Sequence, residues 1–341
     1  MWNQSNTTLH RSNASSSAVT VQLTIWFTAQ LGLSLGGSAL FMLLLLVMYR
    51  LNKLQTGSGL LIAHSLVIEL VYCLLMSPIT TIQAFCQYFQ VPFYYNCRWI
   101  GFFLILILYT EHWSGVMLAL NRFIAVLLPH AYKKVSSKKG SAVAMGFAWT
   151  MSFFLNLTTL QFIPGLQYTR QSATSCRWVG GDGVAFRIVG LLGTYIPIII
   201  QTTCYGSLFL IFQVKKFRET PSANGGERPC ASVQKRLAMT KALCFSFLWY
   251  CACILPPAIM TQIDTGAWKQ NLALLQYSRT SQLLGYAISP VFFFAVNDNY
   301  RSALKQEFQR LSDSNIAGRN CNMKISHLDT TPLQACTSNT A

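Results

Sequence analysis

Seven long apolar segments recur along the chain, with short polar stretches between them. Each has roughly the 20 residues that an α-helix needs to cross about 30 Å of hydrocarbon. A membrane β-barrel would instead show segments of about ten residues with alternating polarity, a pattern that this sequence lacks. The pattern therefore predicts an all-α membrane protein, a seven-transmembrane helix bundle. The expected spans are 23–49, 59–83, 99–128, 142–163, 188–214, 240–262 and 271–296, so the transmembrane domain covers 23–296.

A shorter amphipathic pattern follows the last apolar segment. Its apolar residues are four, four and three positions apart, so they share one stripe of a helix. The segment is too polar to span a membrane, and it predicts a short eighth helix over 297–311 that lies along the inner leaflet. The polar residues beyond it, 312–341, are expected to form a disordered cytoplasmic tail. The stripe consists of Tyr300, Leu304, Phe308 and Leu311.

The loops on one side of the expected bundle carry twice as many basic residues as the N-terminus and the loops on the other side. Basic residues collect in cytoplasmic loops, so the N-terminus is expected outside and the C-terminus inside a multi-pass plasma-membrane protein. The inner loops hold Arg50, Lys53, Lys133, Lys134, Lys138, Lys139, Lys215, Lys216, Arg218, Arg228, Lys235 and Arg236. The outer side holds Arg11, Arg98, Arg170, Arg177, Arg187 and Lys269.

The N-terminal segment 1–22 is polar and contains three Asn-x-Ser/Thr sequons, at Asn3, Asn6 and Asn13. These agree with an extracellular, glycosylated N-terminus. A fourth sequon, at Asn156, falls inside an expected span and is interpreted as fortuitous.

Composition supports a membrane protein, because only 11% of the residues are charged and 52% are hydrophobic. An ordinary soluble domain has about 25% charged residues. The net charge of +16 is explained by the cytoplasmic loops next to anionic lipid, so no nucleic-acid partner is expected.

Enzyme and metal-site motifs are absent from the sequence. It has no His-Glu-x-x-His, no Gly-x-Ser-x-Gly and no Cys/His cluster with zinc spacing. We therefore expect neither catalysis nor a bound metal. An ion or solute transporter or channel remains an alternative, because Glu69 and Glu111 fall inside expected spans, although the sequence shows no repeated halves.

Several motifs share one register along the chain. In the third span, Asn121-Arg122-Phe123 lies 25 residues after Cys97 and 27 residues before Trp149. Pro197 and Tyr205 stand eight apart in the fifth span. The sixth span contains Tyr250-x-x-Cys253-Ile254-Leu255-Pro256, and the seventh contains Ser289-Pro290-Val291-Phe292-Phe293.

This pattern of motifs resembles that of rhodopsin-like (class A) G-protein-coupled receptors. Gly165-Leu166-Gln167-Tyr168 and Ser175-Cys176 most resemble melatonin receptors and their invertebrate relatives.

The resemblance implies coupling to a heterotrimeric G protein, with arrestin and a receptor kinase as further partners. It also implies that an extracellular ligand rearranges the helices, and that Cys97 forms a disulfide with Cys176. The residues that it assigns to coupling and activation are Asn121, Arg122, Phe123, Tyr205, Tyr250, Pro256, Ser289, Pro290 and Phe293.

The chain also departs from the family pattern. Phe41, Glu69 and Ile254 replace the asparagine, aspartate and tryptophan that relatives carry in spans one, two and six. Leu104 stands where amine receptors hold an acid, so an amine ligand is not expected. Leu283 stands where opsins hold the retinal lysine, so light sensing is not expected either.

Arg122 is expected near the inner end of the third span, where the resemblance implies contact with the G protein. In many relatives a glutamate at the start of the sixth helix pairs with this arginine, but here Arg236 occupies that position. Such a pair cannot form, so raised basal activity is expected. The alternative is that Arg122 only extends to the inner headgroups.

Glu111 precedes Arg122 by eleven residues, about 16 Å along a helix and on almost the same face. The resemblance aligns Glu69 and Glu111 with the family's sodium pocket, which also includes Ser289. Two carboxylates this close cannot both ionise easily, so they are expected to share a proton or a sodium ion. The alternative is that one is neutral and bonds to His112 or Ser289. No other cofactor is expected.

Arg279 is placed about 15 Å outward from Ser289, where the ligand pocket of the family opens. Its planar guanidinium suits a carboxylate or another anionic group. A salt bridge to Asp264, or a bond to a loop carbonyl, is an equal alternative. The ligand is thus expected to be a lipid or small molecule, with an anionic group as one option. The candidate ligand-binding residues are Arg279, Leu104, Gln282, Arg177 and Trp178.

Overall fold

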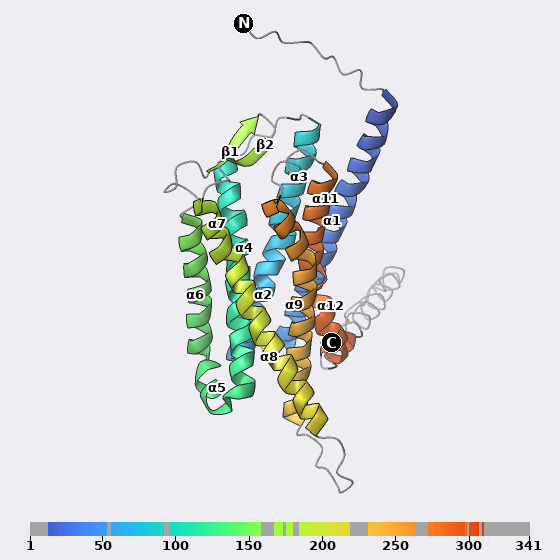
Figure 1. The fold of residues 1–341 in the computed structure, drawn as a ribbon. Helices are drawn as coiled ribbons and strands as arrows, with labels where there is room; N and C mark the ends of the chain where they lie inside the picture. Colours follow the sequence, from blue (N-terminus) through green and yellow to red (C-terminus); the bar gives the residue numbers. More distant parts are fainter. Residues whose placement is uncertain are drawn as a thin grey trace, which may run out of the picture.

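A bundle of long helices makes up the computed structural model (Figure 1). One end of the bundle carries a small hairpin of two strands, and the other end carries a short helix, α5. The structure describes residues 13–52, 56–89, 91, 96–157, 167–172, 175–179, 184–218, 231–263, 272–296, 298, 300–306 and 309.

In the described residues, four of the spans are single helices, and three are built from two or three consecutive helical pieces. The first, third, fourth and sixth spans are α1 (Asn13–Arg50), α4 (Cys97–Leu127), α6 (Lys138–Leu157) and α9 (Ala231–Ile263). The second span joins α2 (Gly57–Val71), the π-helical turn η2 (Tyr72–Met76) and α3 (Ser77–Tyr88). The fifth joins α7 (Val184–Gly190), η4 (Leu191–Tyr195) and α8 (Ile196–Arg218). The seventh joins α11 (Leu272–Ala287) and α12 (Ser289–Val296), and α5 (Pro129–Val135) follows α4.

The predicted seven-helix bundle is confirmed. Within the described residues, six helices are long and apolar enough to cross a membrane. The seventh span has the length as well, but a turn at Ile288 divides it into α11 and α12. Pro290 explains the break, because proline has no backbone N–H and its ring disrupts the helical ladder at the preceding turn.

Two features differ from the expected elements. The first helix begins at Asn13, ten residues before the expected start of the span at Leu23. No glycine or proline interrupts the intervening segment, so the helix continues beyond the apolar stretch. The second is an antiparallel hairpin, β1 (Gln167–Ser172) and β2 (Ser175–Val179), in which Tyr168 faces Trp178. Aromatic residues favour strands, but the segment is too short to signal a hairpin by periodicity.

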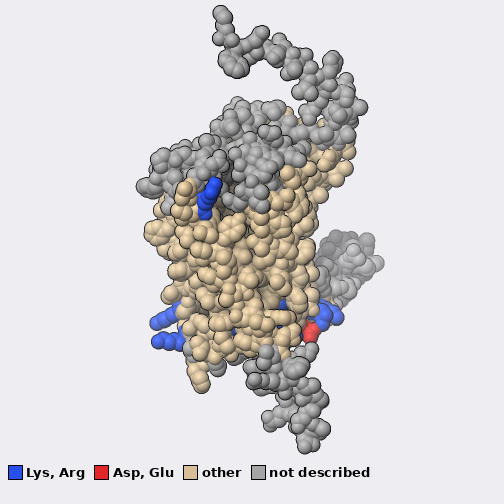
Figure 2. Space-filling model, viewed as in Figure 1, with Lys and Arg blue, Asp and Glu red and all other residues tan. Residues whose placement is uncertain are grey.

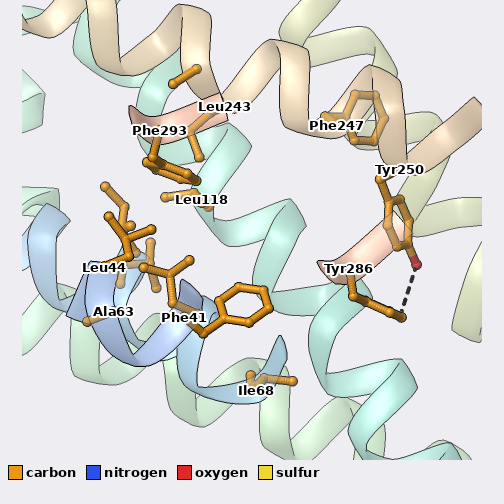
Figure 3. Packing of buried hydrophobic residues seen from close by; sticks show 14 of the residues in the cluster. Phe41, Leu44, Ala63, Ile68, Leu118, Leu243, Phe247, Tyr250, Tyr286 and Phe293 are labelled. Carbon is orange, nitrogen blue, oxygen red and sulfur yellow. Dashed lines mark hydrogen bonds between the residues drawn. The ribbon is translucent and has the colours of Figure 1, made fainter. Parts of the chain in front are cut away.

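A buried cluster of apolar side chains holds the helices of the bundle together (Figure 3). Lipid offers no hydrophobic driving force between helices, so close packing supplies this cohesion. Small residues allow the closest approach. A Cβ on Gly37 in α1 would lie 2.7 Å from the Ala287 Cβ in α11. The labelled members in Figure 3 are Phe41, Leu44, Ala63, Ile68, Leu118, Leu243, Phe247, Tyr250, Tyr286 and Phe293.

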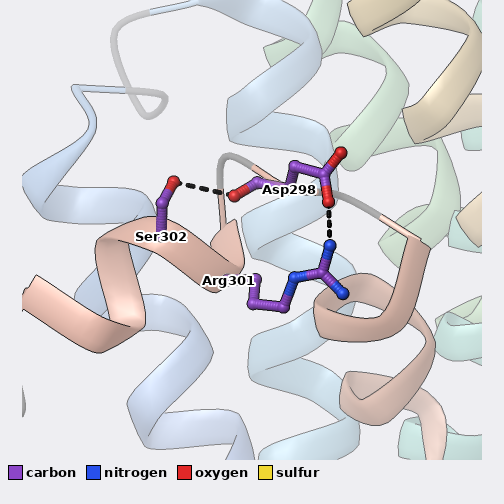
Figure 4. A network of polar contacts seen from close by, with 3 residues as sticks. All are labelled: Asp298, Arg301 and Ser302. Carbon is purple, nitrogen blue, oxygen red and sulfur yellow. Dashed lines mark hydrogen bonds and ion pairs between the residues drawn. The ribbon is translucent and has the colours of Figure 1, made fainter.

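The chain continues after α12 as a short helix, with helical residues at 300–306. Tyr300 is buried and Leu304 packs against the buried cluster, as the amphipathic stripe predicts. Asp298, which is also helical, lies just before these residues. Its carboxylate pairs with Arg301, and its carbonyl accepts a hydrogen bond of 2.7 Å from the Ser302 hydroxyl (Figure 4). The other two members of the stripe, Phe308 and Leu311, and the expected tail lie outside the described residues.

Candidate functional site

A polar cavity of about 50 Å³ lies within the helix bundle. One water needs roughly 10–15 Å³ of this kind of volume, so the cavity has room for a few waters or for an ion with part of its hydration shell. Helices from spans two, three, five, six and seven contribute to its walls. The polar residues that line it include Ser65, Glu69, Glu111, Gln201, Tyr205, Ser246, Tyr250 and Ser289.

The structure brings Glu69 of α2 and Glu111 of α4 to this one cavity. The Ser289 hydroxyl hydrogen-bonds the Glu69 carboxylate, and the Ser289 Oγ lies 2.8 Å from the Oγ of Ser246 in α9. The Oε2 atom of Glu69 is buried, and none of the described residues gives it a hydrogen bond. The cavity therefore contains an acceptor that a proton, a cation or water can satisfy.

His112 does not bond either glutamate, in contrast to one alternative drawn from the sequence. Its Nδ1 lies 2.8 Å from the Gly193 carbonyl oxygen, and its Nε2 lies 2.5 Å from the Tyr250 hydroxyl. A carbonyl only accepts, so Nδ1 carries the hydrogen and Nε2 accepts from Tyr250. Pro197 helps to explain the arrangement, because it has no N–H for the carbonyl four residues before it, that of Gly193.

Two further contacts extend this polar link across the bundle. The side chain of Gln201 in α8 donates to the backbone carbonyl of His112 at 3.1 Å. It can approach because residue 115 is glycine: a Cβ there would lie 2.6 Å from the Gln201 Oε1. On the other side, the Tyr250 and Tyr286 hydroxyls are 3.4 Å apart (Figure 3). Spans three, five, six and seven are thus linked by hydrogen bonds beside the cavity.

Arg122 lies at the inner end of α4 and is only 6% exposed. Its guanidinium interacts electrostatically with the hydroxyls of Tyr205 in α8 and of Tyr300 after α12. Asn121 is also buried, and neither its amide oxygen nor its nitrogen has a hydrogen-bond partner among the described residues. The side chain of Arg236 lies outside the described residues.

The other residues assigned to activation occupy different environments. Phe293 and Pro290 are buried in α12, and Phe123 is half-buried against the apolar cluster. Pro256 and its neighbour Pro257 lie inside α9, with Pro256 exposed on the outer surface of the bundle. They interrupt the backbone hydrogen bonding of the sixth span at its outer half.

Arg279 bonds a helix rather than a loop. Its guanidinium donates to the carbonyl of Thr80 in α3, while Asp264 lies outside the described residues. Leu104 is half-buried and packs against the apolar cluster, and Gln282 is half-buried in α11. Arg279 and Leu104 therefore belong to different walls of the outer half of the bundle, spans seven and three.

A polar junction near Arg279 could not be predicted from the sequence. The Thr280 hydroxyl accepts from Trp26 Nε1 at 3.0 Å and from Gln30 Nε2 at 2.7 Å, and it donates to the Gln276 carbonyl at 2.8 Å. This junction ties α1 to α11. Only the three-dimensional register of the two helices reveals it, because the residues are about 250 positions apart in sequence.

The hairpin packs beside the outer end of α4, where Cys97 is disulfide-bonded. Cys176 lies in β2 with its backbone opposite Arg170. The side chains of Cys176, Arg177 and Trp178 lie outside the described residues, so the pairing of Cys97 with Cys176 stays a prediction.

The fourth span is linked to its neighbours by a histidine that sequence reasoning also missed. Trp149 Nε1 donates to His64 Nε2 at 2.9 Å, and His64 Nδ1 lies 3.1 Å from the Ser114 hydroxyl. Spans two, three and four meet there.

Of the four sequons, the structure describes one side chain. Asn156 is fully buried and donates to the Phe102 carbonyl at 2.7 Å, so its amide is inaccessible to a glycan. Asn3 and Asn6 lie outside the described residues, and only the backbone of Asn13 is described.

Residues 42–291 match the model of the family described as 7 transmembrane receptor (rhodopsin family). The chain is 25% identical over 190 residues to the melatonin receptor type 1A of Gallus gallus, covering 55% of this chain and 53% of that one. It is 25% identical over 239 residues to the neuropeptide S receptor of Mus musculus, covering 65% and 63%. It is 19% identical over 281 residues to the allatostatin-A receptor of Bombyx mori, covering 77% and 74%. The matches to the first two relatives span less than two thirds of their lengths.

Proposed function

Because this chain belongs to the rhodopsin family of seven-transmembrane receptors, we propose that it transmits the binding of an extracellular ligand to a heterotrimeric G protein. Members of this family are receptors rather than enzymes, and the membership gives no support to the alternative of a transporter or channel. Arrestin and a receptor kinase are proposed as further partners, by analogy with the family.

One observation carries the proposal: a single helix, α4, connects the expected ligand side with the expected transducer side. It begins at the disulfide-bonded Cys97, passes the cavity at Glu111 and ends near the buried Arg122. The helix is continuous over 31 residues. A rigid element of this kind can relate events at one membrane face to a protein bound at the other.

The distribution of charge supports an intracellular location for the Arg122 end. Figure 2 shows most of the described basic side chains gathered at the end of the bundle that carries α5, with an uncharged belt above them. Basic residues on that side fit the cytoplasmic face of a plasma membrane, with the N-terminus outside. Tags at both chain ends, probed in intact and in permeabilised cells, test this orientation. Detection of both tags on the same side contradicts it.

The mechanism that we propose is a shift between two populations of the bundle. A ligand that binds the conformation with an open inner end more tightly than the closed one increases the open fraction. Arg122, Asn121 and Tyr205 are all buried, which supports the closed conformation for this structure. Movement of the inner end of α9 would uncover them, and Pro256 and Pro257 provide a weak point in that helix.

The cavity is proposed to bind a sodium ion or to hold a proton shared by Glu69 and Glu111. The acceptor atom of Glu69 without a partner and the volume of about 50 Å³ support either occupant. A carboxylate pair, hydroxyls and an amide offer only hard ligands, which suit a sodium ion better than a soft metal.

The ligand is proposed to be neither an amine nor retinal, because leucines occupy positions 104 and 283. The names of the relatives include melatonin, neuropeptide S and adenosine. A small molecule, a lipid or an anionic ligand that recruits Arg279 away from the Thr80 carbonyl fits the outer half of the bundle.

The test is a panel of Gα subunits in cells that express the full chain, with nucleotide exchange measured with and without pools of indoles, nucleosides, small acids, lipids and peptides. Cells without the chain provide the background. Exchange above that background for at least one subunit is the expected result. The proposal is contradicted if no Gα subunit couples in any condition, or if the chain carries solute across reconstituted vesicles without a G protein.

A further inference from the structure

The sixth and seventh spans each contain a break in their backbone hydrogen bonding. In α9, Pro257 has no N–H for the carbonyl four residues before it, that of Cys253. In the seventh span, the turn at Ile288 leaves a long bond of 3.4 Å from the Ile288 N–H to the Leu284 carbonyl. Backbone carbonyls inside a membrane protein have to be satisfied by the protein itself. Each break therefore favours a donor from outside its own helix.

Each break receives that donor from the other span. The Ser281 hydroxyl of α11 donates to the Cys253 carbonyl of α9 at 2.6 Å. In return, the indole N–H of Trp249 in α9 donates to the Leu284 carbonyl of α11 at 2.9 Å. Both bonds end on backbone atoms at the breaks, so a change in the backbone at either break strains the bond that crosses to the other helix.

The two spans also pack closely at this level. Figure 1 shows α11 and α12 beside α9. A Cβ on Gly285 in α11 would lie 3.2 Å from the Cys253 Cβ, so the glycine allows the close approach. Further along α9, the Ser246 hydroxyl lies 2.8 Å from the Ser289 hydroxyl, at the start of α12. The contact between the spans therefore continues past both breaks.

We propose that the bonds made by Ser281 and Trp249 clamp the hinge of the sixth span to the break of the seventh, so that the two spans bend as a pair. When the inner end of α9 moves, α12 then moves with it, because Ser246 and Ser289 join the segments beyond the two breaks. Ser281 and Trp249 are thus positioning residues for the two breaks. The clamp is a property of the helix pair, whereas its use in opening the bundle rests on the proposed function.

Hydrogen exchange of the full chain in lipid nanodiscs tests the clamp without a ligand or a G protein. Ser281→Ala removes the donor to the sixth span, and Trp249→Phe removes the donor to the seventh. If the breaks are clamped, each substitution speeds the exchange of both segments, 251–260 and 284–293. We expect a rise of about threefold, the typical effect of one hydrogen bond between membrane helices. If each bond only fills a local need, only the segment that loses its donor responds.

Ser278→Ala is the matched control, because it removes a hydroxyl from the same helix about one turn before Ser281. It should change the exchange of neither segment beyond the wild-type rate. A response of both segments to Ser281→Ala and to Trp249→Phe supports the clamp. A response of one segment alone, of neither segment, or of both segments equally to Ser278→Ala overturns it.

A distance measurement tests whether the inner ends of the two spans stay together. Nitroxide labels placed as unnatural amino acids at the exposed positions Lys241 in α9 and Ala295 in α12 report their separation in nanodiscs. The wild-type distribution should have one narrow peak, and Trp249→Phe should broaden it. Two separate peaks in the wild type, or no change in Trp249→Phe, contradict movement as a pair.

The Gα assay is read separately from these measurements. If both segments respond to each substitution but no Gα subunit couples, the clamp stands and the proposed function fails. If a Gα subunit couples while each substitution loosens one segment alone, the proposed function stands and the clamp fails.

Discussion

The imidazole Nε2 of His112 lies 2.5 Å from the Tyr250 hydroxyl, in the middle of the bundle. The other ring nitrogen lies 2.8 Å from the Gly193 carbonyl. One side chain of the third span therefore holds both the fifth and the sixth spans, next to the cavity that contains Glu69 and Glu111. A shift of the sixth span relative to the third has to lengthen or break the bond to Tyr250.

His112→Phe is expected to destabilise the receptor, because it removes the donor to the Gly193 carbonyl and leaves the Tyr250 hydroxyl with only the long 3.4 Å contact to Tyr286. The ring volume is nearly conserved, so the loss of about 1–3 kcal/mol reflects the unpaired polar group rather than a cavity. The measurement is the thermal midpoint of the purified receptor in nanodiscs. Tyr250→Phe removes the other partner, and the double variant should lose less than the sum of the two single losses. Additive losses would show that the two side chains do not interact.

Gly193→Ala is expected to destabilise the receptor, because the new Cβ would lie 2.5 Å from the Tyr109 ring. Neither the helix η4 nor the buried ring can move away easily, and overpacking of this kind costs about 1–3 kcal/mol. Gly190→Ala is the matched control, since a Cβ there meets nothing within 4 Å. It should be neutral or slightly stabilising, as alanine is the better helix former. Equal effects of the two substitutions on the thermal midpoint contradict the close packing of η4 against α4.

The spans could be predicted from sequence because hydrocarbon demands about 20 consecutive apolar residues in every crossing helix. The pairing of Glu69 with Glu111 in one cavity could be anticipated from the family register. His112, His64 and Thr280 could not, because their partners lie on other helices. The bonds depend on how far each helix is rotated and shifted against the next, and two π-helical turns, η2 and η4, change that register within a span.

The hairpin illustrates a second limit. Its two strands are short and lie between helices, so neither alternation nor length distinguishes them from an irregular loop. The candidate ligand-binding residues share this difficulty. The sequence shows Arg279 as a cation in an apolar segment, but its bond to the Thr80 carbonyl depends on the position of α3, which the sequence does not define.

Sodium is expected to raise the thermal midpoint of the wild-type receptor relative to an equal concentration of choline chloride. A ligand that binds only the folded state stabilises it according to its affinity and concentration. Glu69→Gln should abolish the sodium effect, because it removes the carboxylate whose Oε2 has no hydrogen bond in the described structure. Glu111→Gln should weaken it. If neither the wild type nor Glu111→Gln responds to sodium, the proposal that the cavity binds a sodium ion is wrong. A proton shared by Glu69 and Glu111 then explains how the two carboxyl groups lie in one cavity.

Arg279 is expected to determine the response to ligands with a carboxylate or phosphate group. The guanidinium donates to the Thr80 carbonyl, and a charged oxygen is a stronger acceptor than a carbonyl, so an anionic ligand should displace that contact. Arg279→Ala should reduce the potency of such ligands at least about tenfold, the effect of one charge-assisted bond. Arg279→Lys, which keeps the charge but not the planar fork, should give an intermediate loss. Nucleotide exchange measured with an acidic ligand and its neutral ester in parallel provides the comparison, and an equal loss for both ligands would show that Arg279 supports the pocket without binding the anion.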